Sequence, residues 1–314
     1  MEAMKRVMKW SIAASLAISG VAAFAQPTID GTRDALYGTA IVVQDTQTGF
    51  GDSNLGQVDY ANGSELDAAY AYVDMSAQVL YLFLAGNLES NFNKLEIFFD
   101  TGPGGQNRLR GDNSGVDFGG LNRMGDDGSG NGLTFDAGFE ADYWIGITGG
   151  GSPYALYANW AQLLTFGGGP GDYLGSTGAA SNGILSGGNN PYGIRVTINN
   201  SNTGGVEGGS GLASGDGSTV TTGVELAIPF GAIGITGAGV IKVSAFINGV
   251  GHDYLSNQVL GGIGGGGNLG EPRNVNFANI AGNQFFYVVV PEPASLLALG
   301  VGLTGALALR RRRV

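Results

Sequence analysis

The chain has 314 residues, among them 26 acidic and 15 basic residues, 59 glycines, one histidine and no cysteine. Its net charge of −11 argues against nucleic acid as a partner, because phosphate binding depends on clustered lysine and arginine. The lack of cysteine excludes disulfides and thiol chemistry, and one histidine cannot supply the usual zinc ligands.

The first 25 residues have the three parts of a secretory signal peptide. Residues 1–9 carry three basic side chains, residues 10–22 are mostly apolar, and Ala23 and Ala25 form an Ala-x-Ala cleavage site before Gln26. The sequence therefore predicts export, cleavage by signal peptidase, and a mature chain that begins near Gln26.

Residues 26–289 read as one body of short apolar runs separated by glycine-rich stretches. Alternation with a period of two predicts β-strands. We expect strands at Leu66–Met75, Gln78–Leu88, Lys94–Asp100, Phe139–Thr148, Tyr154–Trp160, Gly193–Asn199, Gly223–Phe230 and Val240–Asn248. Long loops are expected at Gly102–Gly138, Gly167–Tyr192 and Asn200–Thr222, with no amphipathic helix of about ten or more residues. This pattern favours the all-β class, as a single jelly-roll-like β-sandwich with long glycine-rich loops.

Three short segments of the body carry a resemblance to a known family. Thr28–Asp34, Leu95–Asp100 and Gly223–Phe230 resemble the I-D-G-x-x-D opening, the F-x-D strand end and the E-x-x-I-P strand of family 9-type carbohydrate-binding modules and their DOMON-like relatives. The resemblance implies a sandwich of about ten strands. It does not imply sugar binding, since many such domains carry no known ligand.

A turn-rich stretch resembles the start of an EF-hand-type calcium loop. Asp127, Ser129 and Asn131 place oxygen donors at alternating positions, and Asp136 adds a carboxylate, but Gly138 stands where a calcium loop has its last glutamate. The alternative is a polar turn without a ligand. No cofactor other than calcium is expected.

The predicted strand Phe139–Thr148 turns Glu140, Asp142 and Trp144 to one face, away from the core. Three interpretations are open. The two carboxylates suit a glycosidase, the outward indole beside them suits a stacking platform for a sugar ring, and a covering loop would leave Trp144 as a packing residue. His252, the sole histidine, is expected in a loop with a solvated or structural role, because no serine has a nucleophile-elbow motif.

The last 25 residues, 290–314, have three parts in a fixed order. Pro291, Glu292 and Pro293 come first, an apolar run follows from Ala294 to Leu309, and Arg310, Arg311, Arg312 and Arg313 come last. The apolar run predicts a short transmembrane helix, and the arginines hold its end in the cytoplasm.

This order resembles the PEP-CTERM sorting signal of Gram-negative bacteria. The resemblance implies recognition by an exosortase, anchoring in the inner membrane and cleavage near the Pro-Glu-Pro motif. A tail anchor that is never cleaved is the alternative. Without both terminal segments, the body keeps 8 basic and 24 acidic residues, a net charge of about −16.

The sequence predicts a non-enzymatic, exported protein of the cell surface or extracellular matrix, associated with exopolysaccharide. The first alternative is a protein like a carbohydrate-binding module, and the second is a secreted hydrolase.

Overall fold

The computed structural model describes residues 25–50, 63–202 and 206–292. The predicted signal peptide up to Phe24 and the predicted transmembrane helix lie outside the described residues. Within the described ranges, no helix is long and apolar enough to cross a membrane.

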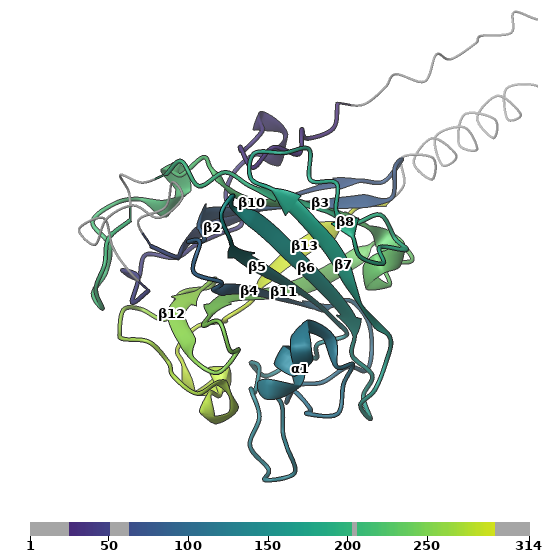
Figure 1. Ribbon diagram of the computed structural model, residues 1–314, viewed down its shortest axis with the longest axis vertical. Helices are drawn as coiled ribbons and strands as arrows, with labels where there is room; N and C mark the ends of the chain where they lie inside the picture. The colour runs from purple at the N-terminus through teal and green to yellow at the C-terminus, as the bar shows by residue number, and fades with distance from the viewer. Residues whose placement is uncertain (1–24, 51–62, 203–205, 293–314) are drawn as a thin grey trace, which may run out of the picture.

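Two antiparallel sheets form the body (Figure 1). The five-stranded sheet has the order β1-β2-β3-β10-β9. Its strands are Val42–Val43 (β1), Glu65–Asp74 (β2), Val79–Asn87 (β3), Gly223–Pro229 (β10) and Arg195–Ile198 (β9).

The eight-stranded sheet has the order β12-β11-β4-β5-β6-β7-β8, and β13 also pairs with β11. Its strands are Leu255–Val259 (β12), Gly239–Asn248 (β11), Lys94–Asp100 (β4), Tyr143–Gly150 (β5), Ala155–Gln162 (β6), Gly171–Gly178 (β7), Ser186–Gly187 (β8) and Phe286–Val290 (β13).

Helical structure is sparse in the described residues. It comprises α1 (Val116–Arg123) and the 3-10 turns η1 (Ala35–Tyr37), η2 (Gly217–Thr219), η3 (Phe230–Ile233), η4 (Pro272–Asn274) and η5 (Phe277–Asn279). The expected all-β class is therefore confirmed.

The main hydrophobic core lies between the two sheets. Period-two alternation turns one set of side chains from each strand into it, so Ile97 of β4, Ile145 of β5 and Leu82 of β3 belong to one buried cluster. This apolar contact between the sheets is the main source of stability in a fold without disulfides.

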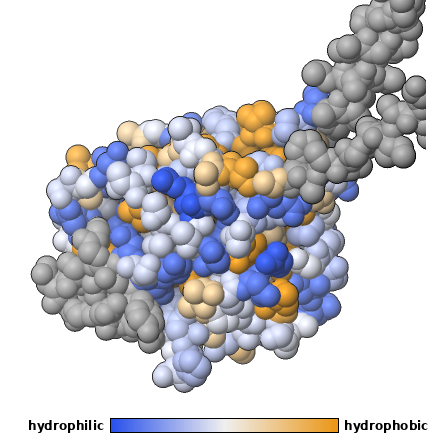
Figure 2. Space-filling view, turned by 90° about the horizontal axis from the view of Figure 1, so that it is seen from above, coloured by the Kyte–Doolittle hydropathy of each residue, from blue (hydrophilic) through white to orange (hydrophobic). Residues whose placement is uncertain are grey.

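Both outer sheet faces also carry covered apolar side chains. Tyr70 and Phe83 belong to a small cluster on the five-stranded sheet. On the eight-stranded sheet, the long segment between β4 and β5 covers a larger cluster that includes Phe98, Leu121 and Phe135. Figure 2 shows the molecule from above, where hydrophobic residues are interspersed with hydrophilic ones.

Each of the eight expected strands corresponds to an observed one, with ends shifted by a few residues. The expectation of a loop over Gly167–Tyr192 is wrong, because β7 and β8 lie inside it. The expected strand start at Phe139 is also wrong, because β5 begins at Tyr143. Strand β7 contains three glycines and lacks alternation, so its pairing with β6 rather than its own sequence defines it.

Candidate functional site

The outer face of the eight-stranded sheet carries a group of charged and aromatic side chains, and Trp144 lies in the middle of the buried cluster on this face. The predicted outward orientation onto solvent is wrong: Trp144 does point away from the main core, but the β4–β5 segment covers it completely. Its indole Nε1–H donates a 2.8 Å hydrogen bond to Oε2 of Glu96. The third interpretation, a packing residue under a loop, is the one that the structure has.

A glycine explains how the indole fits flat against the sheet. Gly146 lies two residues beyond Trp144 on the same strand face, and a Cβ atom there would stand 2.1 Å from Cζ2 of the indole. Glu96 lies opposite Gly146 in the neighbouring strand. The indole therefore occupies the space above Gly146 and reaches Glu96 from there.

Four charged side chains form a buried network next to Trp144. Nδ1 of His252 lies 2.7 Å from Oε1 of Glu96, and its Nε2 lies 2.9 Å from Oδ2 of Asp117. The same oxygen of Asp117 accepts a 3.2 Å bond from Nζ of Lys94, which also donates to Oγ1 of Thr148 at 2.8 Å. We call Glu96, His252, Asp117 and Lys94 the ion network.

Mutual attraction shifts the pKa values of His252 and Asp117 within the ion network. Burial alone would lower the pKa of His252, but the carboxylates of Glu96 and Asp117 raise it to about 9. Burial alone would raise the pKa of Asp117, but His252 and Lys94 hold it below its usual range. At neutral pH, His252 is therefore an imidazolium between two carboxylates.

The network holds a strained segment at the start of α1. Asp117, Phe118 and Gly119 have φ angles of 48°, 55° and 85°, so three consecutive residues adopt the left-handed region. Such a conformation is costly for residues other than glycine and persists only where surrounding contacts enforce it. The two contacts of Asp117 provide that enforcement, and they leave the Phe118 ring fully exposed.

Backbone strain concentrates around this point. In the described part of the chain, six non-glycine residues have positive φ, and four of them are Phe92, Asp117, Phe118 and His252. Phe92 is half-exposed, and it lies with Phe118 along one cleft. Strain of this kind clusters at ligand sites, so its location here marks the cleft as the candidate functional site.

The cleft has a volume of about 900 Å³, and its lining residues come from β4, β5, β6, β7 and the segment around the start of α1. Its aromatic wall consists of Phe92, Phe118, Tyr157 and Tyr173. Neighbouring strands supply a polar floor of Lys94, Thr148 and Asn159.

Sheet register explains why these floor residues meet. Thr148 lies opposite Lys94 on one side and opposite Tyr157 on the other. Asn159, two residues beyond Tyr157, lies opposite Tyr173. All of them therefore fall on the same sheet face, in two adjacent cross-strand rows.

Asn159 is the most informative residue of the floor. Only 3% of its surface is exposed, and its side-chain amide lines the cleft between the aromatic rings. An amide carries both hydrogen-bond donors and an acceptor, so at this position it is suited to receive a polar ligand.

The two acids predicted beside Trp144 have other surroundings. Oδ2 of Asp142 accepts the backbone N–H groups of Thr101 and Gly102, and burial raises the pKa of Asp142. Glu140 is exposed. Neither lines the aromatic cleft, so the structure does not bring Glu140, Asp142 and Trp144 together in one site.

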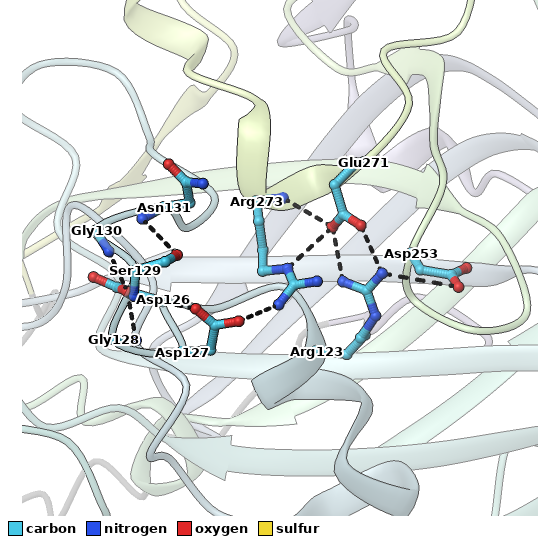
Figure 3. A network of polar contacts seen from close by, with 10 residues as sticks. All are labelled: Arg123, Asp126, Asp127, Gly128, Ser129, Gly130, Asn131, Asp253, Glu271 and Arg273. Carbon is cyan, nitrogen blue, oxygen red and sulfur yellow. Dashed lines mark hydrogen bonds and ion pairs between the residues drawn. The ribbon is translucent and has the colours of Figure 1, made fainter.

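The predicted calcium stretch forms a hydrogen-bonded turn (Figure 3). Oδ1 of Asp127 accepts the Ser129 N–H, and Oγ of Ser129 accepts the Asn131 N–H. The carboxylate of Asp127 points to Arg273, with Oδ2 at 2.6 Å from Nη1.

Asp136 lies apart from this turn, where its Oδ2 accepts the backbone N–H of Gln284. Across the described ranges, no group of three or more acidic, histidine or cysteine side chains converges on a metal position. The turn and Asp136 therefore remain a prediction for calcium that no contact here supports.

Sequence reasoning did not find Asn159, Phe118 or Asp117 as site residues. Period-two alternation in β6 places Asn159 on the face opposite Ala158 and Trp160, and that pattern was available. The left-handed segment at Phe118 had no signal, because its conformation depends on the distant His252.

The terminal processing residues are only partly described. Gln26 is ordered, and its Nε2 donates to Asp74, while Ala23 lies outside the described residues. Pro291 and Glu292 follow β13 and are exposed. Pro293 and Arg310 to Arg313 also lie outside the described residues.

Comparison with protein families identifies the C-terminal segment. Residues 289–313 match the PEP-CTERM protein-sorting motif. The chain is therefore an exported protein sorted by an exosortase, and the motif implies a membrane-anchored C-terminus before sorting. No curated protein and no solved structure gives a significant match, so the resemblance of the body to carbohydrate-binding modules is not supported by a relative.

Proposed function

We propose that this exported protein is a non-enzymatic saccharide-binding component of the cell surface or extracellular matrix, and that it associates with exopolysaccharide through the aromatic cleft. The observation that carries the proposal is the group of exposed aromatic rings along a cleft whose floor includes the amide of Asn159. The sorting motif supports it by bringing the protein out of the cytoplasm.

The cleft offers the two kinds of contact that a sugar needs. Aromatic faces at Phe118 and Tyr173 accept the C–H face of a pyranose ring, as they accept other apolar partners. The amide of Asn159, the hydroxyl of Thr148 and the ammonium of Lys94 match ring hydroxyls. The volume of about 900 Å³ is near the upper end of ordinary ligand sites, which is suited to an oligosaccharide.

The same geometry favours binding over hydrolysis. A glycosidase commonly uses two carboxyl groups, one of them with a raised pKa. Among the described residues that line the cleft, Asp117 is the single carboxylate, and its partners His252 and Lys94 lower its pKa. The carboxylate therefore lacks both a companion and the proton that a general acid needs.

The test measures binding of the full-length chain, purified in mild detergent, to a glycan array and to exopolysaccharide of its own host. We expect Asn159→Ala and Phe118→Ala each to weaken binding by about tenfold, equivalent to about 1.4 kcal/mol. Phe166→Ala is the matched control, because Phe166 is also exposed but lies outside the cleft.

If all three variants bind as tightly as the unmodified chain, the cleft is excluded as the saccharide site. Release of reducing sugar ends by the unmodified chain would instead favour the hydrolase alternative.

A further inference from the structure

A second unusual site lies on β2, in a different sheet from the cleft. Glu65 and Asp67 are 6% and 7% exposed, and each has one buried carboxylate oxygen, Oε2 and Oδ2, without a hydrogen-bond partner. A buried carboxylate without a partner is costly, and two side by side repel each other. A shared proton or a bound cation would relieve this repulsion.

Local backbone geometry forces the two acids together. The register between β2 and β3 shifts between Leu66 and Ala68, which is a β-bulge with Asp67 as the extra residue. Leu66 keeps its place in the main core, whereas Asp67 and Glu65 line one small cavity outside it. Bulges commonly aim a side chain at a site, and here the bulge aims a second carboxylate.

The cavity is suited to an ion. Its volume is about 80 Å³, enough for one cation with a few waters. Among the described residues, its lining contains four carboxylates, no lysine and no arginine. Two of the four, the partly exposed Glu207 and the exposed Asp216, already accept hydrogen bonds from Ser214 and Ser218. The lining also offers neutral oxygen donors from Gln44, Thr46 and Gln47.

We propose that Glu65 and Asp67 bind a divalent cation, with calcium as the best match, and that neutral oxygens of the cavity complete its coordination. Calcium accepts six to eight oxygen ligands and tolerates irregular geometry, so two carboxylates, amide or carbonyl oxygens and waters suffice. Since no third acidic side chain converges with this pair within the described residues, the neutral oxygens are essential to the site.

Burial first, then repulsion from Asp67, raises the pKa of Glu65 well above its usual range, and burial raises the pKa of Asp67 to about 6. A divalent cation bound to the pair would favour the ionised form of both groups and so lower both pKa values.

The cavity lies between distant parts of the chain. Glu65 and Asp67 belong to β2, whereas Ala213, Gly215 and Gly217 belong to the long loop before β10. A cation that binds the acid pair and a backbone oxygen of this loop would fix the loop against the sheet. The site is separate from the cleft, so its function is to stabilise the fold and not to bind saccharide.

The test compares melting temperatures of the full-length chain in a chelator and in about 1 mM calcium chloride. For a dissociation constant near 10 μM, we expect calcium to raise the melting temperature by about 5–10 °C. Glu65→Gln and Asp67→Asn should each abolish most of this rise. Both should melt no lower than the unmodified protein in chelator, since each removes one repelling charge.

The matched control is Asp127→Asn. It changes an acid in the turn at residues 127–131, outside the cavity, and should leave the calcium response intact. No response in the unmodified protein would contradict the proposal, because the acid pair would then share a proton instead. A response that survives Glu65→Gln but is lost in Asp127→Asn would also overturn it and move calcium to the turn at 127–131.

Discussion

The outer face of the eight-stranded sheet has two halves that differ in what covers them. Over β4, β5 and β11, the β4–β5 segment lies on the sheet and makes a dry cluster around Trp144, Phe98 and Phe246. Beside this cluster, Asn159 of β6 and Tyr173 of β7 line an open cleft that also includes Lys94 of β4 and Thr148 of β5. The position of the covering segment therefore separates the core from the site on this sheet face.

The ion network marks the boundary between the two halves. Its inner end, Glu96, is fully buried and bonded to Trp144, and its outer end, Lys94 with Asp117, forms part of the cleft floor. A substitution on the covered side, around Trp144, is therefore expected to lower stability. A substitution on the cleft side is expected to weaken binding.

The largest expected effect comes from the covered half. Trp144→Ala removes a fully buried indole and leaves Oε2 of Glu96 without its donor, so it should cost about 3–5 kcal/mol in the free energy of unfolding. Tyr173→Ala, on the open half, should cost less than about 1 kcal/mol, because the ring is already 41% exposed. Urea denaturation of both variants measures the contrast. Equal losses in the free energy of unfolding would mean that both residues are equally part of the core, and would contradict the distinction between a covered and an open half.

The next effect concerns pH and the boundary itself. The folded-state pKa of His252 is about 9 against an ordinary value of 6.5, so folding favours the imidazolium. Its contribution to stability is fully present below pH 6.5 and is lost as pH rises through 9. At about 1.4 kcal/mol per unit, the loss approaches about 3 kcal/mol.

Urea denaturation between pH 6 and pH 10 checks this loss for His252, with Glu96, Asp117 and Lys94 as the charged groups that face it. In His252→Gln the slope between pH 7 and pH 9 should vanish. A slope of unchanged size in that variant would assign the pH dependence to other groups.

The smallest effect has the opposite sign. Phe118→Gly should stabilise the fold by about 1 kcal/mol or leave it unchanged, because glycine adopts the left-handed region without strain and the ring is fully exposed. Phe166→Gly is the control: Phe166 is exposed too, but its φ is not positive, so glycine there should destabilise. Thermal melts of the two variants should differ in sign. The same sign in both would mean that Phe118 is not held in a strained conformation.

Much of the fold could be predicted, because strands such as β4 show clear alternation between Leu95, Ile97 and Phe99 and their polar neighbours. Strands β7 and β12 could not, since glycine-rich and polar sequences form strands only through their partners. In β12, Ser256, Asn257 and Gln258 are all buried and hydrogen-bonded to backbone groups outside the strand.

For the site, alternation correctly turned Trp144 away from the main core but gave no information about the segment that covers it. The partners of His252 and of Glu65 come from contacts between residues far apart in the chain. No local pattern carries that information, which is why the ion network and the acid pair were found only in the structure.

The end of β13 has a mechanical consequence for processing. This strand is hydrogen-bonded to β11 up to Val290, and the sorting motif begins at residue 289, inside it. Only residues 291–293 separate the last paired residue from the apolar run that starts at Ala294. At full extension this tether spans roughly 13 Å. Because the motif implies a membrane-anchored C-terminus before sorting, the paired part of the fold ends only a few residues before the predicted membrane segment.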